Sequence, residues 1–192
     1  MLTYPCFVPA LTFDTPAEVY VVGRKSSAER THLFIDELRA VNPRADIIWT
    51  EGEYSLVSET RRICREILRN ETRMDLLFLT AGYAPMFSNR VETEEGIEVT
   101  QSLEYYSRIL FVMHLLPPLK AKADIPGRVI SVLGGGLERV AALNLDDIDL
   151  KKPSNFSGPR AQAQYLCLNT VALDKLAEGN PTWFSYIPGL DG

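Results

Sequence analysis

The chain has 192 residues, of which 46% are hydrophobic and 23% charged, and its formal net charge is −5. This composition suits one globular domain over residues 1–192, and the scattered Lys and Arg residues argue against a nucleic-acid partner. The longest apolar segment, residues 109–119, is about half a membrane span, and the N-terminus has no signal-peptide pattern, so we predict a cytoplasmic protein without a membrane segment.

The first predicted strand is EVYVVGRK, residues 18–25, a β-prone run that Gly23 stops. A helix follows, in which Ser26 and Glu29 form a predicted capping box. Its predicted apolar stripe consists of Leu33, Leu38 and Val41. Asn42-Pro43 ends this helix, and ADIIW, residues 45–49, is the next strand.

The next predicted helix, residues 55–70, turns Leu56, Ile63 and Ile67 inward, and a strand follows at residues 75–83. A long helix over residues 95–116 has an apolar stripe at spacings of three and four, formed by Val99, Leu103, Tyr106, Leu110 and Met113. This stripe predicts that the helix lies flat on the sheet.

GRVISVL, residues 127–133, is the next predicted strand, and it opens into Gly134-Gly135-Gly136. A turn-rich rim loop over residues 137–157 leads to a helix over residues 159–178 and to a last strand in WFSYIPG. Strands that alternate with helices predict an α/β fold, a three-layer sandwich with a parallel sheet.

Few residues are available for metal or disulfide chemistry. Cys6, Cys64 and Cys167 are odd in number and far apart, which indicates reduced, buried thiols. The chain has only two histidines, so we predict no metal site.

The motifs VYVVGRK, LLFLTAGY, LEYYSRILF, GRVISVLGGG and ALDKLAEGNP with YIPG follow one another in the order and spacing of the short-chain dehydrogenase/reductases. The chain resembles most closely the divergent fungal members of that family, over about residues 17–190. The resemblance implies a Rossmann-like fold and a family of NAD(P)-dependent oxidoreductases.

Compared with that family, the pattern is incomplete at both ends. Residues 1–16 are an atypical segment without glycine, where the family has its Gly-rich strand, turn and helix for the cofactor pyrophosphate. The chain also stops where the family begins its substrate region, so we expect a truncated Rossmann-like domain or a truncated gene model. NADP(H) is the cofactor implied, if any: Arg24 and Lys25 match the reader of its 2′-phosphate, or are a solvated basic pair, and Ala81 and Gly82 would line the cofactor edge.

The family's catalytic tetrad of Tyr, Lys, Ser and Asn is absent. By ungapped counting, the tyrosine position falls on Gln162 and the lysine position on Leu166. The serine position falls on Leu133 or Gly134, and Glu104 occupies the asparagine position. Family-type proton transfer by tyrosine is therefore not expected here.

Glu104 and Tyr165 remain as candidate catalytic residues. Burial could raise the pKa of Glu104 and make it a general base, or Glu104 could simply pair with Arg108 four residues later. Tyr165 could donate a proton, with a pKa near the ordinary value of about 10, or could be packed in the core.

Three functions follow from this pattern. The first is a degenerate, non-redox member of the family that isomerises or cyclises a small apolar metabolite, or has no catalysis left. The second is an NADP(H)-dependent oxidoreductase acting on a small carbonyl or alcohol. The third is a non-enzymatic partner subunit, a homodimer or heterodimer formed through the helices that carry Glu104 and Tyr165.

Overall fold

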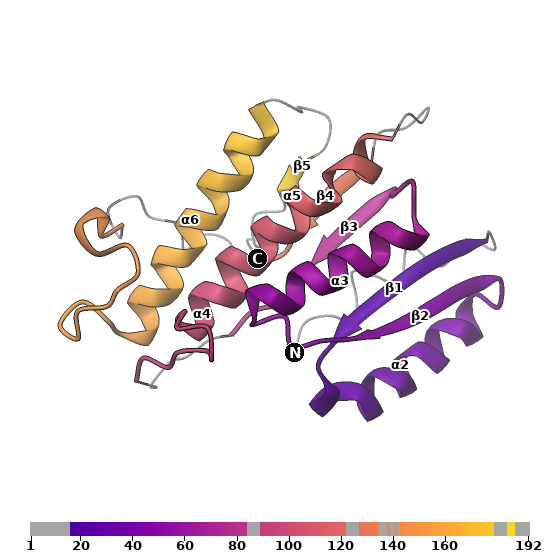
Figure 1. Ribbon diagram of the computed structural model, residues 1–192, viewed down its shortest axis with the longest axis horizontal. Coiled ribbons are helices and arrows are strands. Elements are labelled where there is room, and N and C mark those ends of the chain that lie inside the picture. The colour runs from indigo at the N-terminus through magenta and orange to yellow at the C-terminus, as the bar shows by residue number, and fades with distance from the viewer. Residues whose placement is uncertain are drawn as a thin grey trace, which may run out of the picture. The chain divides into compact units, whose positions relative to one another are not determined.

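The computed structural model describes residues 16–83, 89–121, 127–134, 138, 141, 143–178 and 184–186 (Figure 1). The chain divides into two compact units, Met1–Tyr54 and Ser55–Gly192. The single domain predicted over residues 1–192 stays a prediction.

The first unit contains a two-stranded parallel sheet and one helix. Strand β1 (Ala17–Gly23) pairs with β2 (Ala45–Glu51), in register from Ala17 opposite Ala45 to Gly23 opposite Glu51. Helix α2 (Ala28–Val41) packs on this sheet through a core of Ile35, Leu38 and Ile47. The two predicted strands and the helix between them are thereby confirmed.

The predicted start and apolar face of α2 are wrong in detail. A 3₁₀ turn (Lys25–Ser27) comes first, and Ser27, not Ser26, is the N-cap residue, without a side-chain capping bond. Leu33 is 63% and Val41 51% exposed, whereas Ile35 and Leu38 are buried. Leu33 lies about 200° around the helix axis from Ile35, so the two residues cannot share a face.

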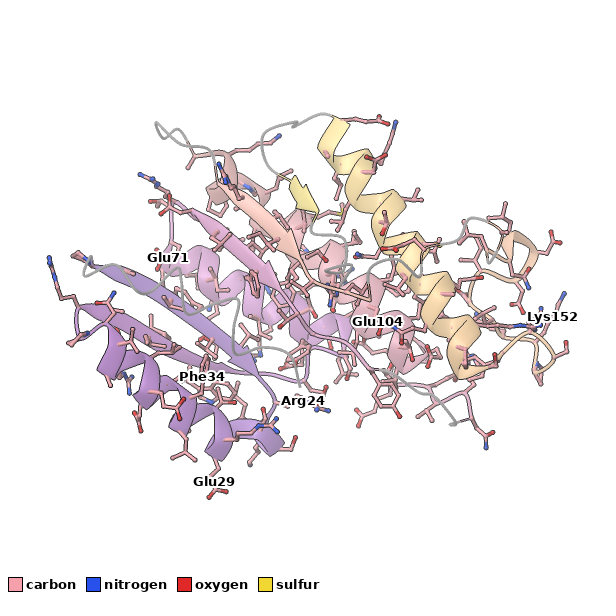
Figure 2. The ribbon with its side chains drawn as sticks, turned by 180° about the vertical axis from the view of Figure 1, so that it is seen from behind. Arg24, Glu29, Phe34, Glu71, Glu104 and Lys152 are labelled. Carbon is pink, nitrogen blue, oxygen red and sulfur yellow. The ribbon has the colours of Figure 1, made fainter. Side chains whose placement is uncertain are left out.

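The second unit has a parallel sheet in the order β3 (Leu76–Leu79), β4 (Arg128–Ser131) and β5 (Phe184–Tyr186). Its helical segments are α3 (Val57–Asn70), α4 (Val99–Gln101), a π-helical turn (Ser102–Tyr106), α5 (Ser107–Lys120) and α6 (Gly158–Glu178). Helices α3 and α5 cover one face of this sheet, as Figures 1 and 2 show from opposite sides. The α/β class with parallel strands is confirmed.

The π-helical turn changes which residues of the long helix face inward. The predicted stripe ends at Met113, which is 56% exposed. The buried residues beyond the turn are instead Phe111, Val112, Leu115 and Leu119. A π turn adds one residue to the helical repeat, so every residue after it is rotated away from the face that an uninterrupted α-helix would give it.

The remaining segments agree with the sequence where they are described. Cys64 and Cys167 are buried free thiols, and burial raises the pKa of Cys64 to about 12, as expected for an inert structural thiol. Cys6, Gly135 and Gly136 lie outside the described residues. None of the described helices is long and apolar enough to pass through a bilayer.

Candidate active site

Glu104 lies at the meeting point of three segments of the second unit (Figure 2). It belongs to the π-helical turn and is 1% exposed. Its carboxylate accepts hydrogen bonds of 2.9 and 2.8 Å from Nε2 of Gln162, on α6, and one of 3.2 Å from the backbone N–H of Tyr83, which follows β3. The Glu104 carboxylate therefore links the long helix, α6 and the end of a strand.

Gly82 lies beside the Glu104 carboxylate, with room for a Cβ atom in ordinary contact. A Cβ atom at position 82 would lie 3.4 Å from Glu104 Oε1 and 3.7 Å from Leu133 Cδ1. A larger side chain would therefore compete with the carboxylate for the same space. Gly82 and Leu133 follow neighbouring parallel strands, at the edge where open α/β sheets bind ligands.

The π-helical turn positions Glu104 at the base of this arrangement. Ser107 N–H donates to the carbonyl of Ser102, five residues earlier, instead of the carbonyl four residues earlier. Such turns widen a helix locally and occur often at functional sites. Leu103 and Glu104 are both buried as a result, so the turn directs an acidic side chain into the unit rather than to solvent.

Burial dominates the electrostatics of Glu104. It raises the pKa of this carboxyl group to about 7, against the lowering effects of the Gln162 and Tyr83 hydrogen bonds and of the Arg108 charge. The nearby Glu98 carboxylate adds to the increase. A carboxyl group with this pKa exists in both protonation states near neutral pH, and it can both accept and donate a proton.

Arg108 holds the ends of two strands and does not pair directly with Glu104. Its five N–H groups donate to the carbonyls of Leu79, Ala81 (two bonds) and Val132 and to Ser131 Oγ, the last at 2.7 Å. No ion pair joins Arg108 to Glu104 among the described residues, so the predicted helix pair is wrong. The π-helical turn rotates the two side chains apart, and burial lowers the pKa of Arg108 to about 10, which leaves it charged at neutral pH.

Tyr165 lies in a separate part of the core. It is 0% exposed, packs with Leu150 and Ala161, and donates from its hydroxyl to the carbonyl of Asp149 at 3.2 Å. Its neighbour Gln164 donates from Nε2 to the carbonyl of Ile148 at 2.7 Å, so α6 holds the described part of the rim loop. Burial raises the pKa of Tyr165 above its ordinary value, which makes the predicted unshifted phenol wrong.

The structure brings together some of the predicted site residues and leaves others apart. Glu104 and Gly82 lie close together, and the carbonyl of the neighbouring Ala81 accepts hydrogen bonds from Arg108. Arg24 and Lys25 are exposed residues that follow β1 in the first unit. Within the described residues, no group of three or more His, Cys, Asp or Glu side chains is arranged to hold a metal ion.

Two partners of Glu104 were not assigned a role from the sequence. Gln162 falls on the tyrosine position by the ungapped count, but its amide cannot transfer a proton, so the sequence predicts no role for it. The backbone N–H of Tyr83 carries no sequence signal beyond its place after Gly82. The sequence does carry one signal for the pair: by the ungapped count, Glu104 and Gln162 fall on two tetrad positions of the family that the chain resembles, and residues of one catalytic tetrad must lie close together in space.

No protein-family model matches the chain. Among curated proteins, it is similar to the NmrA-like family domain-containing oxidoreductase notO of Aspergillus sp., with 37% identity over 86% of this chain and 50% of the relative. It is also similar to oxidoreductase AN1596 of Emericella nidulans, with 36% identity over 93% of this chain and 51% of the relative. The short-chain dehydrogenase/reductase SAT2 of Stachybotrys chartarum is 30% identical over 90% of this chain and 51% of the relative. The chain thus spans about half the length of these curated relatives.

Solved structures resemble the chain in fold. A metagenomic short-chain oxidoreductase in complex with NADP has a TM-score of 0.62 at 13% identity, over 92% of this chain and 80% of that one. The NADPH-dependent 3-quinuclidinone reductase of Rhodotorula rubra has a TM-score of 0.60 at 15% identity, over 93% of this chain and 61% of that chain. At these identities the likeness shows the fold alone.

Proposed function

We propose that Glu104 is the proton-transfer group of a non-redox centre in this protein, which belongs to the short-chain dehydrogenase/reductase superfamily. The reaction would be an isomerisation or cyclisation of a small apolar metabolite. The observation that carries this proposal is a carboxyl group that is 1% exposed, has a pKa of about 7 and accepts three hydrogen bonds.

The proposed chemistry needs one group that removes a proton and returns it elsewhere. The ionised Glu104 carboxylate would take a proton from a carbon next to a carbonyl, and the resulting carboxylic acid would return it to a different atom of the same molecule. Neither of these two proton-transfer steps exchanges electrons with a cofactor. Gln162 and Tyr83 would keep the carboxylate in place, and general acid–base catalysis of this kind contributes about 10²–10⁴-fold to a rate.

The residues described do not provide a complete site for a nicotinamide dinucleotide. Arg24 and Lys25 are exposed and could contact a phosphate group. However, β1 runs into a 3₁₀ turn in which Ser27 N–H and Oγ both bond to the Arg24 carbonyl. The position that matches the family's pyrophosphate turn falls within residues 1–16, of which 1–15 lie outside the described residues, and the carboxylate of Glu104 lies beside Gly82.

Hydrogen–deuterium exchange into small ketones would test the proton transfer without knowledge of the product. We expect the protein to exchange the acidic C–H groups of a suitable ketone in D₂O, followed by NMR, and Glu104→Gln to abolish the exchange. Glu94→Gln, which changes an exposed carboxylate, is the control and should keep the activity. The proposal would be refuted if the exchange persisted in Glu104→Gln. It would also be refuted if the wild-type protein exchanged the C–H groups of no ketone in a broad panel.

The second candidate is an NADP(H)-dependent oxidoreductase acting on a small carbonyl or alcohol. It is favoured by the similarity of the chain to proteins named as oxidoreductases and by the exposed Arg24 and Lys25. A ligand at a hundred times its dissociation constant stabilises a protein by about 2.7 kcal/mol. A saturable thermal shift with NADPH that Arg24→Gln removes would favour this candidate over the first.

A further inference from the structure

A surface cavity between α3 and α5 is a second candidate site, separate from Glu104. It has a volume of about 420 Å³ and is lined by Ser58, Arg61, Arg65 and His114. The first three residues share one face of α3, and His114 comes from α5. His114 follows Glu104 by ten residues, or about 15 Å along a helix, so the cavity is not part of the site described above.

The arginines of α3 divide into two classes. Arg62 is neutralised on both sides, by Glu59 at 3.0 Å and by Glu66 at 2.9 Å. Arg61 and Arg65 form no direct ion pair with the described residues, and Arg65 Nε donates a hydrogen bond to the Arg61 carbonyl. The charge of Arg61 helps to lower the pKa of the nearby Glu95 carboxyl group, so Glu95 offsets part of this charge. Two like charges four residues apart on a helix repel each other, and a bound anion would reduce this repulsion.

The backbone N–H groups at the N-terminus of α3 are not available to bind an anion in the cavity. Glu95 accepts hydrogen bonds from the backbone N–H groups of Val57 and Ser58, at 2.6 and 2.9 Å, and so satisfies the start of the helix. The Ser58 hydroxyl bonds to the same carboxylate. The groups left to face the cavity are the two guanidinium groups and the half-buried imidazole of His114, which are all N–H donors.

We propose that this cavity binds the phosphate group of a small molecule, held by Arg61 and Arg65 with His114 as a third donor. Guanidinium groups match phosphate oxygens with two parallel hydrogen bonds, and a phosphate would add negative charge between Arg61 and Arg65, neither of which has a direct ion pair. The volume lies within the range of small-molecule sites, about 300–1,000 Å³. The same chemistry would accept free phosphate or a phosphate monoester.

Titration of the full chain with inorganic phosphate and with phenyl phosphate, at constant ionic strength adjusted with chloride, tests this assignment. Binding is followed by calorimetry and by NMR shifts of the α3 amides. We expect saturable binding of one anion per chain and a loss of at least about tenfold in affinity in Arg61→Gln and in Arg65→Gln. Tighter binding of phenyl phosphate than of phosphate would identify the monoester as the ligand class, and the reverse would identify free phosphate.

Arg62→Gln is the matched control, because it removes one positive charge from the same helix without touching the cavity. Its affinity should stay within twofold of wild type. Non-saturable binding, equal losses in Arg62→Gln and the cavity variants, or full affinity in Arg65→Gln would each overturn the assignment. Arg61 and Arg65 are exposed, so both variants should fold, and their melting temperatures check this.

Discussion

Replacing Glu104 with glutamine tests whether a buried carboxyl group of raised pKa exists in this protein. Glutamine has nearly the same shape but cannot be ionised. The glutamine at position 104 would accept the hydrogen bond from Tyr83 N–H. Oε1 of Gln162 is buried and has no hydrogen-bond partner among the described residues. If the Gln162 amide rotated, this oxygen could accept a hydrogen bond from the amide N–H₂ of the introduced glutamine. The variant therefore imitates the protonated form of Glu104 at every pH.

The size and sign of the effect follow from the two pKa values. Burial raises the pKa of Glu104 from 4.5 in the unfolded chain to about 7 in the folded state, so the folded state binds the proton more tightly. The stability this gives is fully present below pH 4.5 and is lost as the pH rises through about 7. At about 1.4 kcal/mol per pH unit, the total loss is about 3 kcal/mol.

Urea unfolding of wild type and Glu104→Gln between pH 5 and 8.5 measures this loss. The difference between the two free energies of unfolding should move in favour of the variant by about 2 to 3 kcal/mol across this interval. Glu95→Gln is the control: hydrogen bonds from Ser58 lower the pKa of Glu95, so its contribution is lost only toward acid pH and should stay constant from pH 6 to 8.5. A pH-independent difference for Glu104→Gln would refute the reasoning.

Three further changes test the surroundings of this site and the helix faces. Arg108→Met removes the guanidinium donor from four acceptors at the strand ends, of which the Leu79 carbonyl keeps its bond from Val132 N–H, so we expect the free energy of unfolding to fall by about 3 to 5 kcal/mol; a loss below about 1 kcal/mol in urea unfolding would contradict this role of Arg108. Gln162→Leu removes two hydrogen bonds that favour the carboxylate, so the pKa of Glu104 should rise further, and an NMR titration of the carboxyl carbon that shows a fall would count against it. If the chain pairs through α5 and α6, Val171→Glu, at a position that is 58% exposed, should halve the mass seen by light scattering, whereas a monomeric wild type would dispose of the pairing.

Much of the fold could be predicted because its signals are local. The apolar runs around Val21, Ile47 and Val129 gave the strands, and the parallel pairing followed from the helices between them. The π-helical turn could not be predicted, because its one extra residue leaves no mark in the apolar spacing before it. The sequence pattern therefore places Met113 on the inward face of α5, whereas Phe111, Val112 and Leu115 are the buried residues there.

The sequence was enough to select Glu104 as a candidate residue, but it could not predict the hydrogen bonds that Glu104 accepts. Glu104 was identified because it replaces an asparagine of the family motif, and burial does raise its pKa. The donors around it depend on tertiary contacts between residues 21 and 58 positions apart in sequence, which no periodicity encodes. The partners of Arg108 also depend on tertiary contacts. Its spacing from Glu104 predicts an ion pair on the helix, but all five of its N–H groups donate hydrogen bonds to acceptors at the ends of two strands.

The two buried charges also bear on whether the centre has decayed or has been rebuilt. A carboxylate at position 104 costs about 3 kcal/mol at neutral pH, and a leucine there would avoid this cost. Such a leucine would leave the Arg108 charge buried without an anion nearby, since the Glu104 charge raises the pKa of Arg108 against the effect of burial. A centre that drifted without selection would more readily lose both charges, as in well-packed apolar replacements of buried ion pairs. The presence of both charges, with Gln162 donating two hydrogen bonds to Glu104, is therefore consistent with the proposed proton-transfer role of Glu104.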